Sequence, residues 1–414
     1  MKEIPRRQNQ YTQLETKVRP DPIGLYIHVP FCETKCPYCD FNTYSKLEIL
    51  IPSYVSALIK EIHVWGGYLG KRLVDSIFFG GGTPSYLPRG DINRILFAVR
   101  ESFNVTHNAE VTLEANPGDL NNDNLSVLLD SGINRLSIGF QSLEDSLLTL
   151  LGRRHSADEA IEAFNKARDA GYDNISVDLM YGISDQSMDD WRNTLKKLLS
   201  VAIPPEHVSL YCLTLEGGTP MEVQVNNGNM TRPDDDLAAD MYLLAENMLR
   251  DAGYDHYEIS NWSMIGKESR HNMKYWLNTP YLGVGPGAHS YLNSTRFSNI
   301  KSPREYVKLL ASQELLEMPD KQIHNVSDYM SVIYDSESID NKLEMAETMM
   351  LGLRLMKGIK DQDFVDRFAV SFFDVYQDEI SDLEAMGLIE YSGGYIRITE
   401  SGRLLANEVF LRFF

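Results

Sequence analysis

In Cys32-Glu33-Thr34-Lys35-Cys36-Pro37-Tyr38-Cys39, three of the four cysteines of a 414-residue chain fall within eight positions. Their spacing is C-x3-C-x2-C. Disulfide scaffolds are small and spread their cysteines along the chain, so this cluster indicates a metal site or a catalytic site instead. A metal that is held by three protein ligands keeps an open position, where chemistry can take place.

Two kinds of metal fit the cysteine cluster. Structural zinc usually has four ligands in two pairs, and a second pair is missing here, although the distant Cys212 is a candidate fourth ligand. An iron–sulfur cluster with three cysteine ligands leaves one iron free to bind another molecule. The spacing favours the iron–sulfur cluster, and zinc remains the alternative.

The surrounding sequence alternates short β-branched or aromatic runs with amphipathic segments. We expect strands at 24–29, 74–79, 111–114, 135–139, 174–179 and 207–214, with helices at 51–66, 89–103, 121–131, 156–170 and 189–201. Six successive strand–helix units predict an α/β fold with a parallel sheet, closed or partly closed into a barrel.

Polar and glycine residues follow the predicted strands, at the end where such barrels carry their active sites. Cys32 comes after the first strand, and Gly80-Gly81-Gly82-Thr83-Pro84 comes after the second. Glu114, Gln141 and Asp178 lie at the ends of the third, fourth and fifth strands. We therefore expect these residues to line one site.

After residue 233 the alternation of strands and helices stops. Residues 234–253 predict a helix, and 255–289 is loop-rich. The C-terminal part predicts helices and a hairpin at 387–399 around Ser392-Gly393-Gly394, which resembles a winged helix. We divide the chain into a polar tail (1–20), a barrel core (21–233), a helix and loop-rich segment (234–335) and a helical, winged-helix-like C-terminal domain (336–414).

Composition restricts the function. The formal net charge is −20, and no recognition helix is basic, so nucleic acid is not an expected partner. The first 20 residues have no apolar core of signal-peptide length, and no run approaches a membrane span. We expect a cytoplasmic protein.

The cysteine run with Tyr26, His28 and Pro30 before it, together with the Gly80–Pro84 run, resembles the radical S-adenosylmethionine (SAM) superfamily. More narrowly, it resembles the coproporphyrinogen III oxidase-like group that contains HemN and HemW. The resemblance implies a partial (β/α)6 TIM-like radical SAM barrel with a [4Fe-4S] cluster on Cys32, Cys36 and Cys39. It also implies that SAM binds through Tyr26, Gly80, Gly81, Gly82, Thr83, Glu114, Gln141, Arg153 and Asp178. The family pattern selects Arg153 over the adjacent Arg154.

Two features indicate the subgroup. HemN-type oxidases have a further cysteine where this chain has Phe41, and the Cys39-Asp40-Phe41 ending resembles HemW. The run His271-Asn272-Met273-Lys274-Tyr275-Trp276 is similar to the H-N-x-x-Y-W motif of HemW heme chaperones. If this run is helical, His271 and Tyr275 share one face. The resemblance implies that His271, Asn272, Tyr275 and Trp276 are heme candidates. The alternative is packing on the barrel, with a hydrogen bond from His271.

The function that the resemblance implies is binding heme and delivering it to acceptor hemoproteins. The alternative is an enzyme, an oxygen-independent coproporphyrinogen III oxidase. The implied partners are heme, acceptor hemoproteins and a low-potential electron donor. A homodimer and peripheral membrane association through the acceptors are compatible with this function. Whether the chain acts as an enzyme stays open at this point.

Overall fold

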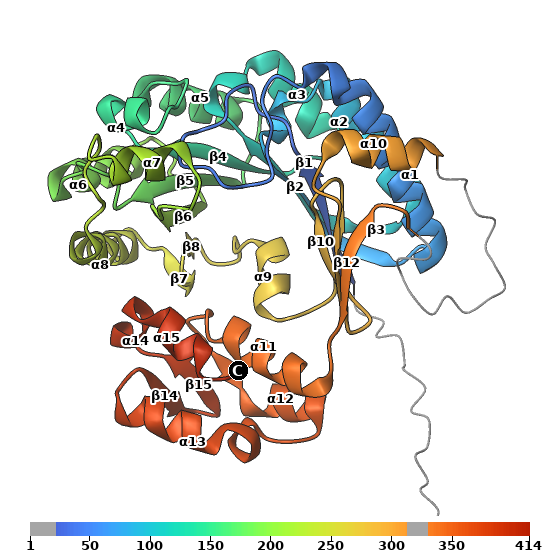
Figure 1. Cartoon of the computed structure of the whole chain (residues 1–414). Coiled ribbons are helices and arrows are strands. Elements are labelled where there is room, and N and C mark those ends of the chain that lie inside the picture. The colour runs from blue at the N-terminus through green and yellow to red at the C-terminus, as the bar shows by residue number, and fades with distance from the viewer. Residues whose placement is uncertain (1–21, 313–329) are drawn as a thin grey trace, which may run out of the picture.

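A twelve-stranded sheet forms the centre of the protein (Figure 1). The computed structural model describes residues 22–312 and 330–414, and the predicted tail at 1–20 lies outside them. Six adjacent parallel strands confirm the predicted core: β1 (Ile23–Val29), β2 (Leu73–Gly81), β3 (Asn104–Ala115), β4 (Arg135–Gln141), β5 (Ile175–Tyr181) and β6 (His207–Cys212).

Helices cover the convex side of these strands. The main ones are α1 (Ile51–Leu69), α2 (Arg89–Ser102), α3 (Asn122–Asp130), α5 (Ala157–Asp169), α6 (Met188–Leu199) and α8 (Asp235–Asp251). Ser156 and Ser187 begin α5 and α6 with capping boxes, which satisfy amide groups that have no partner inside the helix. Shorter elements are η1 (Glu48–Leu50), η2 (Pro84–Tyr86), η3 (Pro117–Asp119), α4 (Asp145–Leu150), α7 (Pro220–Asn226) and α10 (Pro303–Ser312).

The two flanks of the sheet come almost entirely from residues 234–335, for which the sequence predicts a helix and loops. Strand β9 (Tyr281–Val284) runs parallel to β1 and continues into β10 (His289–Leu292), β11 (Thr295–Asn299) and β12 (Ile333–Ser338). On the other flank β8 (Asn261–Ser263) and β7 (Asp255–Glu258) extend β6. Within the described residues β12 and β7 remain unpaired edges, so the barrel is partial, as predicted.

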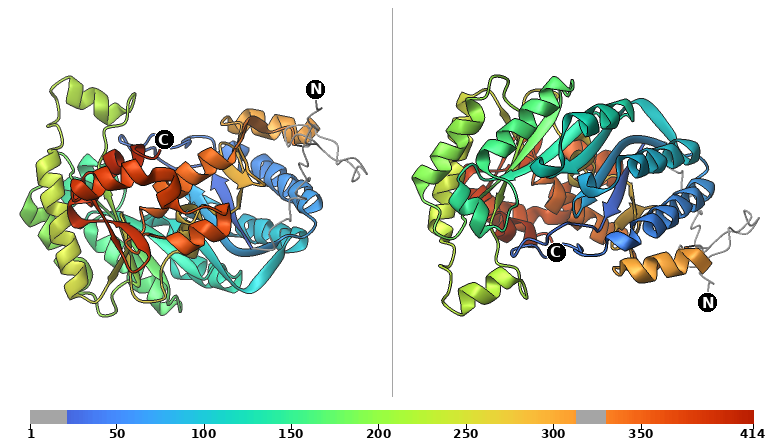
Figure 2. Two further views of the ribbon diagram at one scale, coloured as in Figure 1. Left: turned by 90° about the horizontal axis from the view of Figure 1, so that it is seen from below. Right: turned by 90° about the horizontal axis from the view of Figure 1, so that it is seen from above.

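The C-terminal domain has its own hydrophobic core, centred on residues such as Phe364, Phe372 and Ile396. It contains α11 (Asn341–Gly352), α12 (Asp361–Phe368), α13 (Phe372–Ala385), α14 (Glu400–Leu404) and α15 (Ala406–Leu411). The predicted hairpin is β14 (Ile389–Ser392) with β15 (Tyr395–Ile398), and β13 (Ile359–Lys360) joins it as a third strand. Figures 1 and 2 show this domain lying across the concave side of the curved twelve-stranded sheet.

Helix α9 (Arg270–Trp276) lies between the barrel and the C-terminal domain. Asp75 on β2 forms an ion pair with Lys274 at 2.8 Å, and Glu110 on β3 accepts hydrogen bonds from the first amides of α9. On the other side, Asn278 Nδ2 donates to Thr348 Oγ1 of α11. No helix among the described residues is long and apolar enough to cross a membrane.

Candidate cofactor site

The cysteine loop follows β1 and is fastened back to it. Tyr44 pairs with Phe31, the amide of Cys32 donates to the Tyr44 carbonyl at 3.0 Å, and the Tyr44 amide donates to Pro30. Lys35 Nζ donates to the carbonyls of Phe41 and Thr43, each at 3.2 Å. These bonds hold the loop over the carboxyl ends of the strands.

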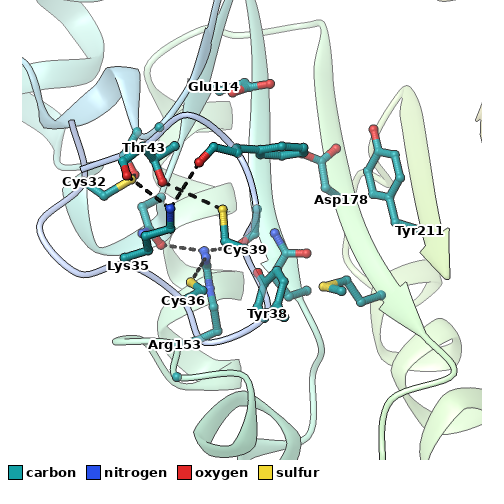
Figure 3. A pocket seen from close by; sticks show the side chains of 18 of the residues that line it. Cys32, Lys35, Cys36, Tyr38, Cys39, Thr43, Glu114, Arg153, Asp178 and Tyr211 are labelled. Carbon is teal, nitrogen blue, oxygen red and sulfur yellow. Dashed lines mark hydrogen bonds between the residues drawn. The ribbon is translucent and has the colours of Figure 1, made fainter. Parts of the chain in front are cut away.

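Each cysteine sulfur has a polar neighbour. Thr83 Oγ1 donates to Cys32 Sγ at 3.4 Å, and an Arg153 guanidinium nitrogen lies 3.6 Å from Cys36 Sγ. Cys39 Sγ lies 3.9 Å from Thr43 Oγ1. Figure 3 shows the three sulfurs gathered near Lys35 and Arg153. Hydrogen bonds and a positive charge at sulfur are the features that tune an iron–sulfur cluster.

Three cysteine thiols are a donor set that suits an iron–sulfur cluster. Among the described residues no three His, Cys, Asp or Glu side chains come close enough together to hold one metal ion. An iron–sulfur cluster spreads its ligands over several iron atoms, so its cysteines need not meet at one point. Burial raises the pKa of Cys32 and of Cys39, and a bound metal would deprotonate them outright.

The glycine run is required by close packing. A Cβ on Gly81 would lie 2.5 Å from the His28 ring, and one on Gly82 would lie 2.6 Å from the Phe31 carbonyl oxygen. Gly81 also has a φ of 110°, which favours glycine. The glycines therefore let the second strand end directly against the cysteine loop.

Two carboxylates lie deeper in the same pocket. Glu114 accepts a hydrogen bond from the Gly81 amide at 3.1 Å, and Ser137 Oγ donates to both oxygens of Asp178 at 3.0 and 3.1 Å. Burial raises the pKa of Glu114 to about 8, and the nearby charge of Asp178 adds to the rise. Burial also raises the pKa of Asp178. The empty pocket thus disfavours the charged forms of both carboxyl groups, and a cation or donating hydroxyl groups would stabilise them.

The two neighbouring arginines point to different places. Arg153 bonds to Asn116 Oδ1 and the Gly139 carbonyl, each at 2.8 Å, and reaches Cys36. Arg154 also lines this pocket, but its guanidinium pairs with Glu33 and Asp119. Gln141 has a left-handed backbone (φ of 67°) at a bulge in β4, and such strain in a non-glycine residue is common at functional sites.

One cavity of about 450 Å³ unites most of these groups. From the predicted sets it is lined by Cys32, Cys36, Cys39, Gly81, Gly82, Thr83, Glu114, Gln141, Arg153 and Asp178. Tyr26 and Gly80 are absent from the lining. Tyr26 packs behind Gly80, where a Cβ would lie 3.1 Å from its ring, and its hydroxyl lies 3.0 Å from His28 Nδ1.

Several lining residues were not predicted as site residues. Ser137 and Tyr211 line the cavity, and Figure 3 shows Tyr211 beside Asp178. Both belong to the inward-facing set of their strands, so the alternation along β4 and β6 is the signal that identifies them. Cys212, the candidate fourth ligand, also lines the cavity, next to Tyr211.

The H-N-x-x-Y-W residues lie elsewhere, on α9. His271 is 1% exposed, and its Nδ1 and Nε2 lie 3.0 Å from Ser76 Oγ and 2.9 Å from Tyr275 Oη. The predicted helical pairing of His271 with Tyr275 is therefore present. Trp276 packs under Arg354, whose guanidinium carbon lies 4.5 Å from its ring centre. The Asn272 amide donates to Ser269 Oγ at the N-cap.

Comparisons with known proteins agree with the fold and the motifs. The Radical SAM superfamily model matches residues 26–198, and the HemN C-terminal domain model matches 339–405. Heme chaperone HemW of Bacillus subtilis (strain 168) is 33% identical over 94% of this chain and 98% of its own length. Heme chaperone HemW of Lactococcus lactis subsp. lactis (strain IL1403) is also 33% identical, over 95% and 97%.

Among solved structures, coproporphyrinogen III oxidase (HemN) from Escherichia coli superimposes with a TM-score of 0.81. That match covers 96% of this chain and 91% of HemN at 21% sequence identity, and it supports the fold alone. The 33% identity to the two HemW proteins, over nearly the full length of each, shows the family as well. The chain belongs to the family of HemW heme chaperones, within the radical SAM superfamily.

Proposed function

We propose that this protein binds heme and transfers it to acceptor hemoproteins, and that it carries a [4Fe-4S] cluster on Cys32, Cys36 and Cys39. The observation that supports the proposal best is the near full-length similarity to heme chaperones, in a chain that has Phe41 after its cysteine cluster. The Phe41 side chain is 66% exposed at the rim of the cavity.

The cavity suits SAM as the second cofactor. When bound, the cluster supplies an open iron position and an electron. Arg153 offers a cation for a carboxylate, and Glu114 and Asp178 offer acceptors for ribose hydroxyls. The sulfonium charge would offset the two buried carboxylates. The Gly80–Gly82 run and Thr83 border the methionine part, with Gln141 beside it, and Tyr26 supports this edge from behind.

Heme is proposed to bind at α9 through His271, Asn272, Tyr275 and Trp276. An imidazole is an ordinary axial ligand for heme iron, and flat aromatic rings stack on porphyrins. Because both ring nitrogens of His271 are hydrogen bonded, iron can bind only after the His271–Tyr275 bond or the His271–Ser76 bond opens. Heme binding at His271 therefore includes a local rearrangement of α9.

The remaining partners follow from this function. A low-potential electron donor would reduce the cluster, and acceptor hemoproteins would receive the heme. We propose that this takes place in the cytoplasm, and that peripheral membrane association through an acceptor or formation of a homodimer would be compatible with it.

The competing function is that of an oxygen-independent coproporphyrinogen III oxidase. Because the chain shares its fold with HemN, this function is tested as well. One sample tests both functions: protein reconstituted anaerobically with iron and sulfide, titrated with heme and assayed with coproporphyrinogen III and SAM. We expect stoichiometric heme binding and no protoporphyrinogen. Robust decarboxylation would contradict the chaperone function and support the enzyme.

A further inference from the structure

A chain of hydrogen bonds leaves the cofactor cavity at Asp178 and runs through the inside of the barrel. Ser176 Oγ lies 3.3 Å from Asp178 Oδ1 and 2.8 Å from His207 Nδ1. His207 Nε2 in turn lies 2.9 Å from Tyr257 Oη. The chain thus connects β5, β6 and β7 across the lower part of the barrel.

With Asp178 ionised, the donors in this chain point one way. The carboxylate only accepts, so Ser176 donates to it and accepts from Nδ1–H of His207. The unprotonated Nε2 then accepts from the Tyr257 hydroxyl. His207 is 1% exposed, and burial lowers its pKa well below the ordinary value, so the ring stays neutral.

The chain ends at the helix that carries the heme candidates. The amide of Ser269 donates to Tyr257 Oη at 3.4 Å, and Ser269 is the N-cap of α9. The next two amides, those of Arg270 and His271, donate to Glu110 at 3.2 and 3.1 Å. Glu110 lies on β3, four residues before Glu114, and both therefore point to the same face of the sheet. The first turn of α9 is thus tied directly to β3, which carries Glu114, and through Tyr257, His207 and Ser176 to β5, which carries Asp178.

We infer that His207 and Tyr257 are positioning residues that couple occupancy of the cofactor cavity to the stability of the first turn of α9. The inference rests on the proposed function, because it takes SAM as the ligand of Asp178. Hydroxyl groups that donate to Asp178 compete with Ser176 for its oxygens. The resulting change in the hydrogen bonds of Ser176 passes through His207 and Tyr257 to the Ser269 amide.

This coupling assigns a purpose to SAM in a protein that carries heme. Coupling between two sites is reciprocal, so a ligand that opens α9 changes the affinity for SAM by the same factor. Couplings of this kind typically amount to about fivefold or more. SAM would then act as a regulator of the helix that binds heme.

The test measures amide hydrogen exchange of residues 270–276 in the cluster-reconstituted full chain, with and without saturating SAM. In the wild type we expect SAM to speed this exchange by about fivefold or more, because it weakens the Ser176–Asp178 bond at the start of the chain. Tyr257→Phe removes the hydroxyl that links His207 to Ser269. We expect it to bind SAM within about twofold of wild type and to lose the effect on α9.

Two further variants separate coupling from folding. Tyr254→Phe removes a buried hydroxyl that donates to the Pro205 carbonyl and does not belong to this hydrogen-bond chain. In this variant SAM should change the exchange of α9 as much as in the wild type. His207→Asn places an amide donor near the position of Nδ1 but does not reach Tyr257. It should keep most of the SAM affinity and lose the coupling, whereas His207→Leu should weaken SAM binding as well.

The inference is overturned if SAM binds to the wild type without changing exchange in α9, or if Tyr257→Phe responds to SAM as the wild type does. Failure of the wild type to bind SAM overturns both the cofactor assignment and the coupling. Because heme is absent from this experiment, a separate failure to bind heme contradicts the chaperone function alone.

Discussion

The hydroxyl of Tyr275 lies 2.9 Å from Nε2 of His271, one helical turn earlier in α9. Ser76 occupies the other ring nitrogen, and the ring stacks on Phe78 with centres 5.3 Å apart. The histidine proposed to bind heme iron is therefore engaged inside the barrel. The next two predictions depend on the burial of His271 and on its hydrogen bonds.

Burial lowers the pKa of His271 to about 3, and the charges of Lys274 and Arg135 add to the shift. The unfolded chain binds a proton near pH 6.5 and the folded protein does not, so stability is lost as pH falls from about 6.5 towards 3. In His271→Gln this contribution is absent. Between pH 7 and pH 5 the wild type should lose about 2 kcal/mol more than the variant in urea unfolding. Equal losses would contradict the assignment.

Removing the Tyr275 hydroxyl should favour heme. Tyr275→Phe frees Nε2 of His271, and the net stabilisation of one such bond is about 1 kcal/mol, so heme affinity should rise about threefold to tenfold. Absorbance titration of the reconstituted protein measures it, and Tyr254→Phe is the control that loses a buried hydroxyl elsewhere. An unchanged or weaker affinity in Tyr275→Phe would show that iron does not bind at Nε2 of His271.

Glu114 destabilises the protein in the absence of cofactor. Its folded pKa of about 8 lies above the unfolded value of about 4.5, so stability is lost as pH rises through this range. Glu114→Gln should match the wild type at pH 4.5 and exceed it by about 4 kcal/mol at pH 8.5, because each unit of pKa shift corresponds to about 1.4 kcal/mol. It should also bind SAM at least tenfold more weakly. A stability difference that is independent of pH would exclude this titration.

Arg153 and Arg154 form a matched pair for mutation. Arg153→Gln removes the guanidinium that contacts Cys36 and should weaken SAM binding by about tenfold to a hundredfold. Arg154→Gln removes a guanidinium that is already paired with two carboxylates, Glu33 and Asp119, and should change SAM affinity less than about twofold. Equilibrium dialysis with SAM measures both, and the reverse ranking would exchange their roles.

The central strands and the cysteine site could be predicted because their signals are local. Buried β-branched runs mark β1 to β6, while the start of β3 was missed because Asn104, His107 and Asn108 are polar and exposed. Strands β7 to β11 are only three to five residues long, which is too short for a period-two pattern.

Other features depend on partners that are distant in the sequence. The burial of His271 depends on Ser76 and Phe78 of β2, and the direction of Arg153 depends on Asn116 and Cys36. No spacing within α9 indicates that its histidine enters the barrel. The inward position of Ser137 and Tyr211 follows from strand alternation only once the register of β4 and β6 is known.

The central claim is transfer of heme, and the most direct measurement mixes the heme-loaded, cluster-reconstituted protein with an excess of an apo-hemoprotein under anaerobic conditions. Separation of the two proteins, followed by absorbance spectroscopy of each, shows where the heme resides. We expect heme to leave this protein and to appear in the acceptor with the spectrum of the native hemoprotein. Heme that stays on this protein, or a protein that never retains heme but converts coproporphyrinogen III, would contradict this expectation.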